Sequence, residues 1–384
     1  MRFRDALAAP GLAAVAEVKR RSPSAGDLRP DADPRRLAVE YERAGAAAVS
    51  ILVDQRFGGS WDDLRAARAA GVPLLAKGFF ATEEELRTAR EAGADAVLLL
   101  LRDLENDAAK RLLGAAEVLG LDTLVEAHDA LELARAEALG APVIGLNARD
   151  LETFEIDRRA QLELIAGAPR DRIIVAESGI ESRVQGAEAE LAGADAILVG
   201  TALMRAPEPA RKLAELLARP LVKVCGLTRE EDVAVAAEAG ADLAGFVLVE
   251  ASPRWARDVL PVPDTMLAVA VCVGEPSEAP ADLVQLYPHE DGKVRGRDGV
   301  LLRDGQEVAR VLDLPWQEAD PGHLERAARA DGRIMLAGGL GPENVRMAIE
   351  TVRPWAVDAS SSLELEPGIK DHERVRAYVE AARG

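Results

Sequence analysis

The chain has 384 residues, of which 48% are apolar but only 3% aromatic, and its formal net charge is −19. This length suits two domains whose cores are built from Ala, Val, Leu and Ile. The charge argues against a nucleic-acid-binding protein, because phosphate backbones require a cationic face; it is typical of a well-solvated surface.

Cysteine and histidine usage excludes two further classes. Two cysteines, Cys225 and Cys272, are too few for a disulfide framework and favour a reducing compartment. The four histidines show no ligand spacing, so we expect no metal. No apolar run approaches the roughly 20 residues of a membrane helix, and polar residues interrupt any N-terminal signal core. We therefore expect a cytoplasmic protein that binds no membrane.

Short apolar runs alternate with helix-length amphipathic stretches along the first 200 residues or so, which indicates βα units with parallel strands. A glycine precedes many of the runs, as is typical of a helix C-terminus; these glycines lie 47 to 53 residues apart and are Gly45, Gly93, Gly140, Gly193 and Gly240. We predict eight strands, at 12–18, 48–53, 72–76, 96–101, 122–126, 143–147, 173–177 and 196–200. Such a series predicts a (β/α)8 TIM barrel, with a doubly wound open sheet as the alternative.

A proline-rich stretch around one helix, 210–218, leads into a second series. Its predicted strands are 221–225, 243–249, 267–273, 282–286, 309–313, 333–337 and 355–359, and a further one at 300–302 would make eight. Only 27 residues separate Leu286 from Asp313, whereas two βα units of the first series take about 48. We predict an α/β protein with two tandem TIM barrels, 1–218 and 219–384, the second trimmed in its middle.

Polar residues stand where the strands of the first barrel end. In such barrels the strand ends meet at one mouth, where functional groups lie. One strand-end charge is usually a solvated loop residue, but burying several without partners costs several kcal/mol each. The set therefore predicts a catalytic mouth, formed by Glu17, Lys19, Lys77, Glu126, Asn147 and Glu177.

Two glycine-containing turns follow strands seven and eight, Ser178-Gly179 and Gly200-Thr201. Loops at these places commonly bind phosphate through backbone N–H groups, and glycine allows the backbone to approach closely. The alternative is an ordinary βα turn with a hydroxyl cap.

These motifs resemble the indole-3-glycerol-phosphate synthase family. The run from Glu17 to Ser24, EVKRRSPS, is similar to the family's E-x-K-x-x-S-P-S signature, and the match spans residues 11 to 205. Further family motifs follow in the same order: Ser50-Ile51-Leu52, Phe57-Gly58-Gly59-Ser60, Leu75-Ala76-Lys77, Val125-Glu126, Gly145 to Leu151, and Glu177 to Ile180.

The resemblance implies the substrate 1-(2-carboxyphenylamino)-1-deoxyribulose 5-phosphate, closed to an indole with loss of CO2 and water and without a cofactor. It implies catalytic roles for the six residues of the mouth. We assign the acid of ring closure to Lys77 and take Lys19 and Glu126 as candidates for the dehydration, leaving open which lysine acts in which step. It also implies substrate or phosphate contacts from Ser22, Arg149, Ser178, Gly179, Gly200 and Thr201.

Two departures from the family concern the first half. Gly78 stands where the family has Asp after the catalytic lysine, which alters the setting of Lys77. Only about a dozen residues precede the first strand, where the family has a longer helical extension. We expect that difference to remove part of a lid over the phosphate end.

The second half resembles phosphoribosylanthranilate isomerase, which catalyses the preceding step, an Amadori rearrangement. The resemblance starts at Lys223-Val224-Cys225-Gly226 and continues through Ser252-Pro253-Arg254 to Pro367-Gly368-Ile369-Lys370-Asp371. It implies Cys225 as general base, Asp313 as general acid and Arg254 as the partner of the anthranilate carboxylate. Phosphate contacts are implied for Gly338, Gly339, Ser360 and Ser361.

This half departs further from its family. Tyr287-Pro288 replaces His-Gly, Ser362 replaces Gly, and Leu314-Pro315-Trp316-Gln317 stands where the family has a mobile Gly-rich loop. A thiol acts as a base only as thiolate and Asp313 must stay protonated, so both need an enclosed site. We therefore expect weak or absent isomerase activity, unless Trp316 and its neighbours form a replacement lid. The alternative is a monofunctional synthase whose second barrel is structural.

Another phosphate-binding barrel enzyme, of the thiazole or histidine pathway, is a rival interpretation. The run that begins at Glu17 and the presence of Asn147 argue against it. As partners we expect small phosphorylated substrates and other enzymes of tryptophan biosynthesis.

Overall fold

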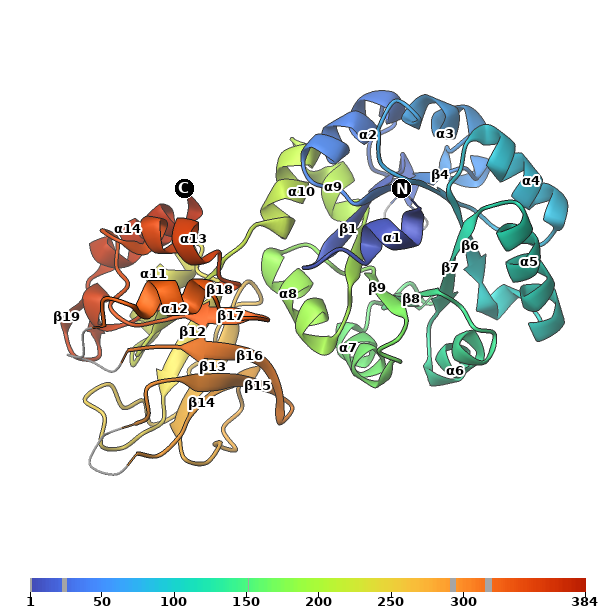
Figure 1. Ribbon diagram of the computed structural model, residues 1–384. Coiled ribbons are helices and arrows are strands. Elements are labelled where there is room, and N and C mark those ends of the chain that lie inside the picture. Colours follow the sequence, from blue (N-terminus) through green and yellow to red (C-terminus); the bar gives the residue numbers. More distant parts are fainter. Residues whose placement is uncertain (1, 23–25, 151, 291–294, 315–319) are drawn as a thin grey trace. The chain divides into compact units, whose positions relative to one another are not determined.

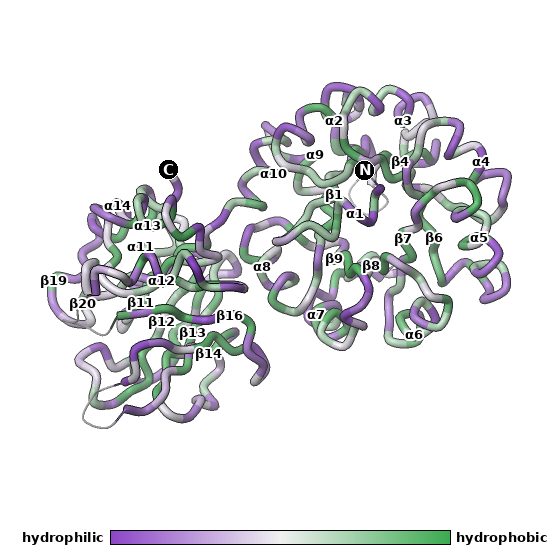
Figure 2. The backbone as a smooth tube through the Cα atoms, viewed as in Figure 1, coloured by the Kyte–Doolittle hydropathy of each residue, from purple (hydrophilic) through white to green (hydrophobic). Residues whose placement is uncertain are grey.

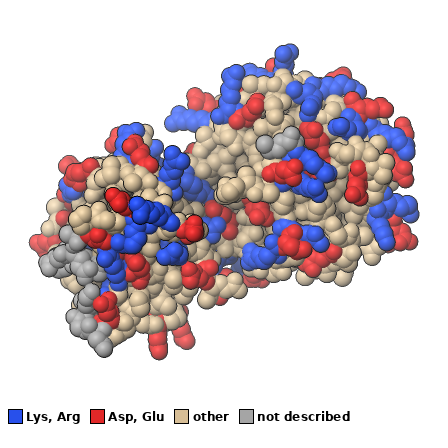
Figure 3. Space-filling model, viewed as in Figure 1, with Lys and Arg blue, Asp and Glu red and all other residues tan. Residues whose placement is uncertain are grey.

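The computed structural model describes all residues except 1, 23–25, 151, 291–294 and 315–319. The chain divides into two compact units, Met1–Leu217 and Ala218–Gly384 (Figure 1). Among the described residues, no helix combines the length and apolar character needed to cross a membrane. Acidic and basic side chains are interspersed over the visible face of each unit (Figure 3).

The first unit is a closed barrel of eight parallel strands. The first strand pairs with both its chain neighbour and the last strand, so the sheet closes and the open-sheet alternative is wrong. The predicted strands are confirmed to within two residues at each end. They are β1 (Ala13–Val18), β4 (Ala48–Leu52), β5 (Leu74–Lys77), β6 (Ala96–Leu100), β7 (Asp122–Ala127), β8 (Val143–Asn147), β9 (Ile173–Glu177) and β10 (Ala196–Val199).

A helix follows every strand of this barrel. Gly93 and Gly193 end two of them with φ of +99° and +116°, the left-handed conformation that explains the repeated glycine phrase. The helices are α2 (Pro34–Arg43), α3 (Trp61–Ala67), α4 (Glu83–Ala92), α5 (Asn106–Val118), α6 (Ala130–Ala138), α7 (Arg158–Gly167), α8 (Arg183–Ala192), α9 (Thr201–Arg205) and α10 (Pro209–Leu217).

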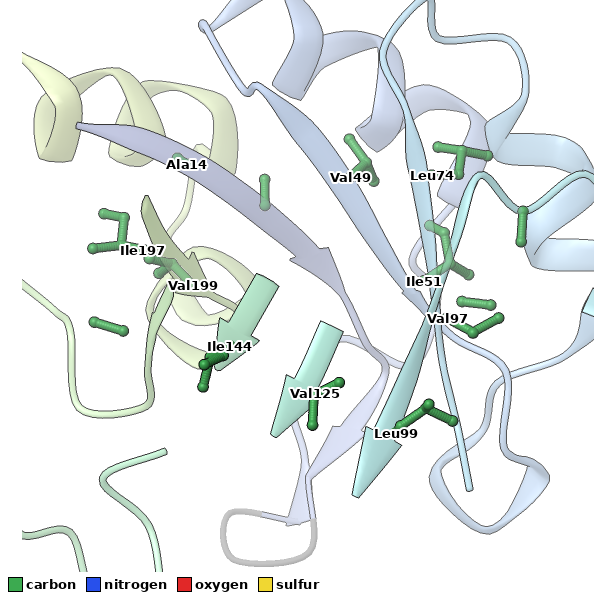
Figure 4. Close-up of a cluster of buried hydrophobic side chains, with 14 of the residues drawn as sticks. Ala14, Val49, Ile51, Leu74, Val97, Leu99, Val125, Ile144, Ile197 and Val199 are labelled. Atoms are coloured by element: carbon green, nitrogen blue, oxygen red, sulfur yellow. The ribbon is translucent and has the colours of Figure 1, made fainter. Parts of the chain in front are cut away.

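Apolar side chains form two layers in the first unit. Alternate strand residues such as Val49, Ile51 and Val97 pack in one cluster with helix residues such as Leu86 (Figure 4). The intervening strand residues fill the barrel interior, as the period of two along a strand requires. The tube in Figure 2 shows this pattern as apolar strands ringed by more polar helices.

A short N-terminal helix, α1 (Phe3–Leu7), closes the amino end of the first barrel. Phe3 and Leu7 are fully buried in the interior layer, and Arg2 forms an ion pair of 2.6 Å with Asp122, the first residue of β7. The segment before the first strand therefore lies at the end opposite to the strand carboxyl termini.

The second unit is also a closed barrel of eight strands. Its strands are β11 (Leu221–Cys225), β12 (Leu243–Val247), β13 (Leu267–Val273), β14 (Leu283–Tyr287), β15 (Gly299–Arg303), β16 (Gln306–Leu312), β17 (Ile334–Leu336) and β18 (Ala356–Ala359). Its helices are α11 (Glu230–Glu238), α12 (His323–Ala328), α13 (Val345–Val352) and α14 (His372–Arg383), and a small hairpin joins β19 (Glu364–Glu366) to β20 (Ile369–Lys370).

The shortened middle of this barrel has a structural explanation. The weak candidate at 300–302 is confirmed as a strand, β15, but it runs antiparallel to both β14 and β16. Asp304 and Gly305 connect β15 to β16, with φ of +48° and +76°, as a tight two-residue hairpin requires. A reversed strand thus stands where two helices and a parallel strand are expected between β14 and β16, and in the described part of the chain no helix lies between α11 and α12. The second barrel is therefore trimmed, as expected, yet closed.

Candidate active sites

The carboxyl end of the first barrel gathers the six predicted residues of the mouth. Glu17 lies in β1, Lys77 ends β5, and Lys19 follows β1 directly. The three carboxylates are almost fully buried, at 1–3% exposure. Glu126 lies in β7, and Asn147 and Glu177 end β8 and β9.

Lys77 is shared by the three carboxylates. Its Nζ lies 2.7 Å from Glu177, 3.5 Å from Glu17 and 3.9 Å from Glu126. Lys19 Nζ pairs with the other oxygen of Glu17 at 2.7 Å. Burial opposes the charge of Lys77, but the carboxylates outweigh it and raise the pKa of Lys77 well above its ordinary value. This lysine therefore stays an ammonium.

The carboxylates have opposite pKa shifts. Burial alone would raise the pKa of Glu17, but Lys19 and Lys77 outweigh it and lower this pKa to about 2. Burial and the charge of Glu126 raise the pKa of Glu177 to about 7, which Lys77 offsets only in part. The mouth thus holds one permanent anion and one carboxyl that titrates near neutral pH, as acid–base catalysis requires.

A further residue, which the sequence analysis did not single out, belongs to this cluster. His128 Nε2 lies 3.2 Å from Oε1 of Glu126, and Nδ1 lies 3.0 Å from Glu132. Asn147 donates to the same Oε1 of Glu126 at 2.8 Å. The only sequence signal was a histidine two residues after a predicted catalytic carboxylate.

The predicted phosphate turns lie at the same mouth. Ser178 and Gly179 both adopt positive φ, 67° and 69°. A Cβ on Gly179 would lie within 3 Å of Ile156 and Arg158, so this position requires glycine. Gly200 precedes α9, which begins at Thr201.

Gly200 also lies against the charged cluster at the mouth. A Cβ there would clash with the carboxylate of Glu17 and lie 2.9 Å from Nζ of Lys19. This glycine therefore leaves room for the Glu17–Lys19 pair, whatever else binds beside it.

Two more predicted binding residues lie in loops at this end. Ser22 is buried in β2 (Arg21–Ser22), which pairs with β3 (Gly26–Asp27), while Pro23 and Ser24 of the signature fall outside the described residues. The backbone N–H of Arg149 donates to Oδ1 of Asn147 at 3.0 Å, and its guanidinium donates to the carbonyl of Phe154.

In the second barrel, Cys225 ends β11 and is buried among charged groups. Burial raises the pKa of its thiol, and the neighbouring Lys223 counteracts this only in part. Lys223, fully buried, donates to Gln285 at 2.7 Å and pairs with Asp358 at 2.9 Å.

Asp313 follows β16 and is held by two groups. Tyr287 donates its hydroxyl hydrogen to Oδ2 of Asp313 at 2.6 Å, and Arg295 pairs with the same oxygen at 2.6 Å. Burial raises the pKa of Asp313 despite the guanidinium of Arg295. Tyr287 is the residue that replaces His of the family. This difference from the family therefore changes a direct hydrogen-bond partner of the predicted general acid, Asp313.

Arg254 is paired within the protein. Its guanidinium binds Glu364 through Nε and Nη2, at 2.8–3.0 Å, and Lys370 binds the same carboxylate at 2.8 Å. The predicted partner of a substrate carboxylate thus already binds a carboxylate of its own chain.

The predicted phosphate residues of this barrel follow β17 and β18. Gly338 and Gly339 have φ of +94° and +66°, and Ser360 and Ser361 begin the turn after β18. The hydroxyl oxygen of Ser360 is buried and has no hydrogen-bond partner among the residues that the structure describes. Residues 315–317, including Trp316 of the suggested replacement lid, fall outside the described residues.

Comparison with known proteins agrees with this architecture. Residues 1–216 match the family model described as indole-3-glycerol phosphate synthase, and residues 317–381 match N-(5'phosphoribosyl)anthranilate (PRA) isomerase. The chain belongs to the indole-3-glycerol phosphate synthase family. It is similar to the tryptophan biosynthesis protein TrpCF of Yersinia pestis, with 33% identity over 96% of this chain and 84% of that relative.

Two further relatives refine the picture. Indole-3-glycerol phosphate synthase of Mycolicibacterium gilvum is 45% identical over 55% of this chain and 79% of the relative. The multifunctional tryptophan biosynthesis protein of Phycomyces blakesleeanus is 31% identical over 97% of this chain, which spans 62% of that longer protein. The chain therefore carries a lyase domain of tryptophan biosynthesis followed by an isomerase domain.

Proposed function

We propose that residues 1–218 close the indole ring of 1-(2-carboxyphenylamino)-1-deoxyribulose 5-phosphate and that the mouth around Lys77 is the active site. The observation that carries this is one ammonium within 4 Å of three buried carboxylates. The carboxylates keep this group an ammonium until the substrate binds, and it can then donate a proton to the C2′ carbonyl oxygen and become a neutral amine.

Ring closure joins C2′ to the ring carbon that bears the carboxyl group. That carbon becomes sp³, so the carboxyl leaves as CO2 and its bonding electrons restore the aromatic ring. The C2′ hydroxyl then leaves as water, which needs an acid at that oxygen and a base for the proton lost. Lys19 and Glu126 can supply this pair, with Glu17 and Glu177 holding the lysines and Asn147 holding Glu126.

The 5′-phosphate would bind at the turns after β9 and β10. Ser178 and Gly179 both have positive φ, and turns with left-handed residues can direct backbone N–H groups toward an anion. The proposed phosphate and substrate contacts are Ser22, Arg149, Ser178, Gly179, Gly200 and Thr201. We expect no cofactor, and a cytoplasmic location follows from the substrate's place in biosynthesis.

For residues 219–384 we propose an isomerase domain of low turnover. Cys225 would be the general base and Asp313 the general acid, Arg254 would bind the substrate carboxylate, and phosphate would bind at Gly338, Gly339, Ser360 and Ser361. Turnover is low because burial raises the pKa of the Cys225 thiol and because Glu364 already binds Arg254. The alternative, a second barrel that is only structural, is not favoured, because residues 317–381 match the isomerase family model and the TrpCF relative aligns over 96% of the chain.

Steady-state ring closure by the full chain tests the first assignment. Formation of indole-3-glycerol phosphate from the synthetic substrate should be inhibited competitively by inorganic phosphate or sulfate. The inhibiting concentration should be about tens of millimolar, the level expected for a weak anion site. Absence of ring closure would contradict the proposed function, and turnover without anion inhibition would contradict only the phosphate site.

A further inference from the structure

His128 lies between two carboxylates from different elements. It follows the last residue of β7, and its ring is largely buried, with 15% of the side chain exposed. Nε2 lies 3.2 Å from Glu126 and forms an ion pair with it, and Nδ1 lies 3.0 Å from Glu132 of α6. Glu132 also accepts the backbone N–H of His128 at 2.9 Å, which fixes the ring to the helix.

This placement determines the charge of the ring. A neutral imidazole has one N–H and one lone pair, so one nitrogen would turn a lone pair toward a carboxylate. Nδ1 is hydrogen-bonded to Glu132, and Nε2, which has no hydrogen-bond partner among the described residues, lies 3.2 Å from Oε1 of Glu126, so two nearby negative charges favour the imidazolium. Burial alone would lower the pKa of His128, but Glu126 and Glu132 outweigh it and raise the pKa to about 9.

The charge matters because of the balance at the mouth. Lys19 and Lys77 are two cations facing three carboxylates, and Lys77 lies much closer to Glu177 than to Glu126. Glu126 is 2% exposed, so water cannot compensate its charge. Its nearest partners are neutral Asn147 and the ring of His128. His128 is thus the cation that compensates Glu126.

We propose that His128, held by Glu132, is a cationic positioning residue that keeps Glu126 ionised and oriented for its role in the synthase reaction. This rests on the proposed function of the first barrel. His128 does not act on substrate itself. It acts through Glu126, and its own charge depends on Glu132, which lies on the other side of the imidazole ring from Glu126.

The pH dependence of kcat distinguishes a cationic positioning role of His128 from a purely structural one. The charged groups that face His128 are Glu126 and Glu132. Lys77 and Glu177 lie on the other side of Glu126 and influence its charge. If the cation is required, kcat falls as His128 loses its proton at alkaline pH. Glu132→Gln keeps both hydrogen bonds to His128 but removes one charge. It should therefore move that alkaline limb to lower pH by about one unit, the low end of the effect of one nearby charge.

His128→Gln tests the charge directly. Gln can still donate a hydrogen bond to Glu126 but carries no charge at any pH. We expect kcat to fall about tenfold at neutral pH, with KM little changed, and the alkaline limb assigned to His128 to disappear. The matched control is His372→Gln, another histidine 2.8 Å from a carboxylate but in the second unit, which should leave the synthase pH profile unchanged.

A second readout does not depend on turnover. In nitrogen-15 NMR of the full chain, the imidazole signals missing from the His128→Gln spectrum belong to His128. In the wild type, both nitrogens should have the chemical shifts of an imidazolium near pH 8. In Glu132→Gln, the ring should lose its proton at a lower pH. A neutral ring at pH 7.5, or a wild-type alkaline limb in His128→Gln, would overturn the proposal. If the wild type closes no ring, the proposed function fails, and the NMR titration still decides the charge of His128.

Discussion

In the first barrel, Lys77 lies within 4 Å of three carboxylates, whereas in the second barrel Arg254 pairs with Glu364 and Arg295 pairs with Asp313. In this shared arrangement, burial and the charge of the neighbouring Glu126 together raise the pKa of Glu177 to about 7. In the second barrel the predicted substrate-binding arginine and the predicted general acid are thus already bound to groups of their own chain, which leaves them less available to a substrate.

The two barrels also differ in how many of their strands are followed by a helix. Every strand of the first barrel is followed by a helix, so each strand end opens into a loop at the mouth. In the second barrel β15 runs in reverse, and in the described residues β12 to β15 are followed by no helix. Closure of an eight-stranded sheet therefore survives the loss of helices and even one reversal. A catalytic mouth depends more on the loops, because they carry the binding groups.

The largest expected effect comes from removing the shared cation. Lys77→Met should lower synthase turnover by at least about 10²-fold with the fold intact, the scale of general acid catalysis. Circular dichroism and steady-state kinetics of the full chain measure both. The control is Lys212→Met, which removes a partly exposed lysine paired with Glu215 on α10 and should leave turnover unchanged. Near-normal turnover in Lys77→Met would remove Lys77 from the mechanism.

A smaller loss should follow from crowding the Glu17–Lys19 pair. Gly200→Ala places a Cβ against the carboxylate of Glu17 and 2.9 Å from Nζ of Lys19. Displacing these groups should lower kcat by up to about 10²-fold, as small misplacements do. Gly114→Ala on α5 is the matched control, since its Cβ meets nothing within 4 Å. Equal turnover in the two variants would show that the pair tolerates the shift.

The pH dependence of the first barrel should report Glu177. Because its pKa is raised to about 7, the carboxyl is protonated below that pH, and kcat should rise as it ionises against Lys77. The raised pKa also contributes to the free energy of unfolding. This contribution is fully present below pH 4.5, the ordinary pKa, and is lost as the pH rises through about 7. Urea unfolding at about pH 5 and about pH 8 should show this loss in the wild type. An equal loss in Glu177→Gln would contradict the assignment.

The smallest effect concerns the helices. Thr82 and Glu85 form a reciprocal capping box at the start of α4, whereas no side chain of the described residues caps α12 or α13 in the second barrel. Thr82→Ala should lower the free energy of unfolding by about 1 kcal/mol without changing synthase kcat. Denaturant titration measures the first and steady-state kinetics the second. A change in kcat would mean that α4 influences the mouth.

The sequence predicted the first barrel well because each signal was local. A glycine with positive φ precedes a strand, and a polar residue such as Lys77 or Glu177 ends it. Parallel strands then bring those ends together. His128 escaped notice because its significance lies in distances to Glu126 and Glu132, which spacing alone does not give.

The second barrel was harder for a physical reason. Its reversed strand is short, and a run such as Val300-Leu301-Leu302 does not indicate direction. Asp304-Gly305 is a recognised hairpin signal, and it could have revealed the reversal. The pairing of Arg254 with Glu364 joins residues 110 positions apart and had no sequence signal.

The most direct test of this contrast is to measure both turnovers on one preparation of the unaltered full chain, each with its own substrate. We predict ring closure at least about 10²-fold faster than the isomerase reaction, with the residual isomerase activity lost in Cys225→Ala and ring closure unchanged there. Isomerase turnover within about tenfold of ring closure would contradict the account, because the paired groups of the second barrel would then not impede catalysis.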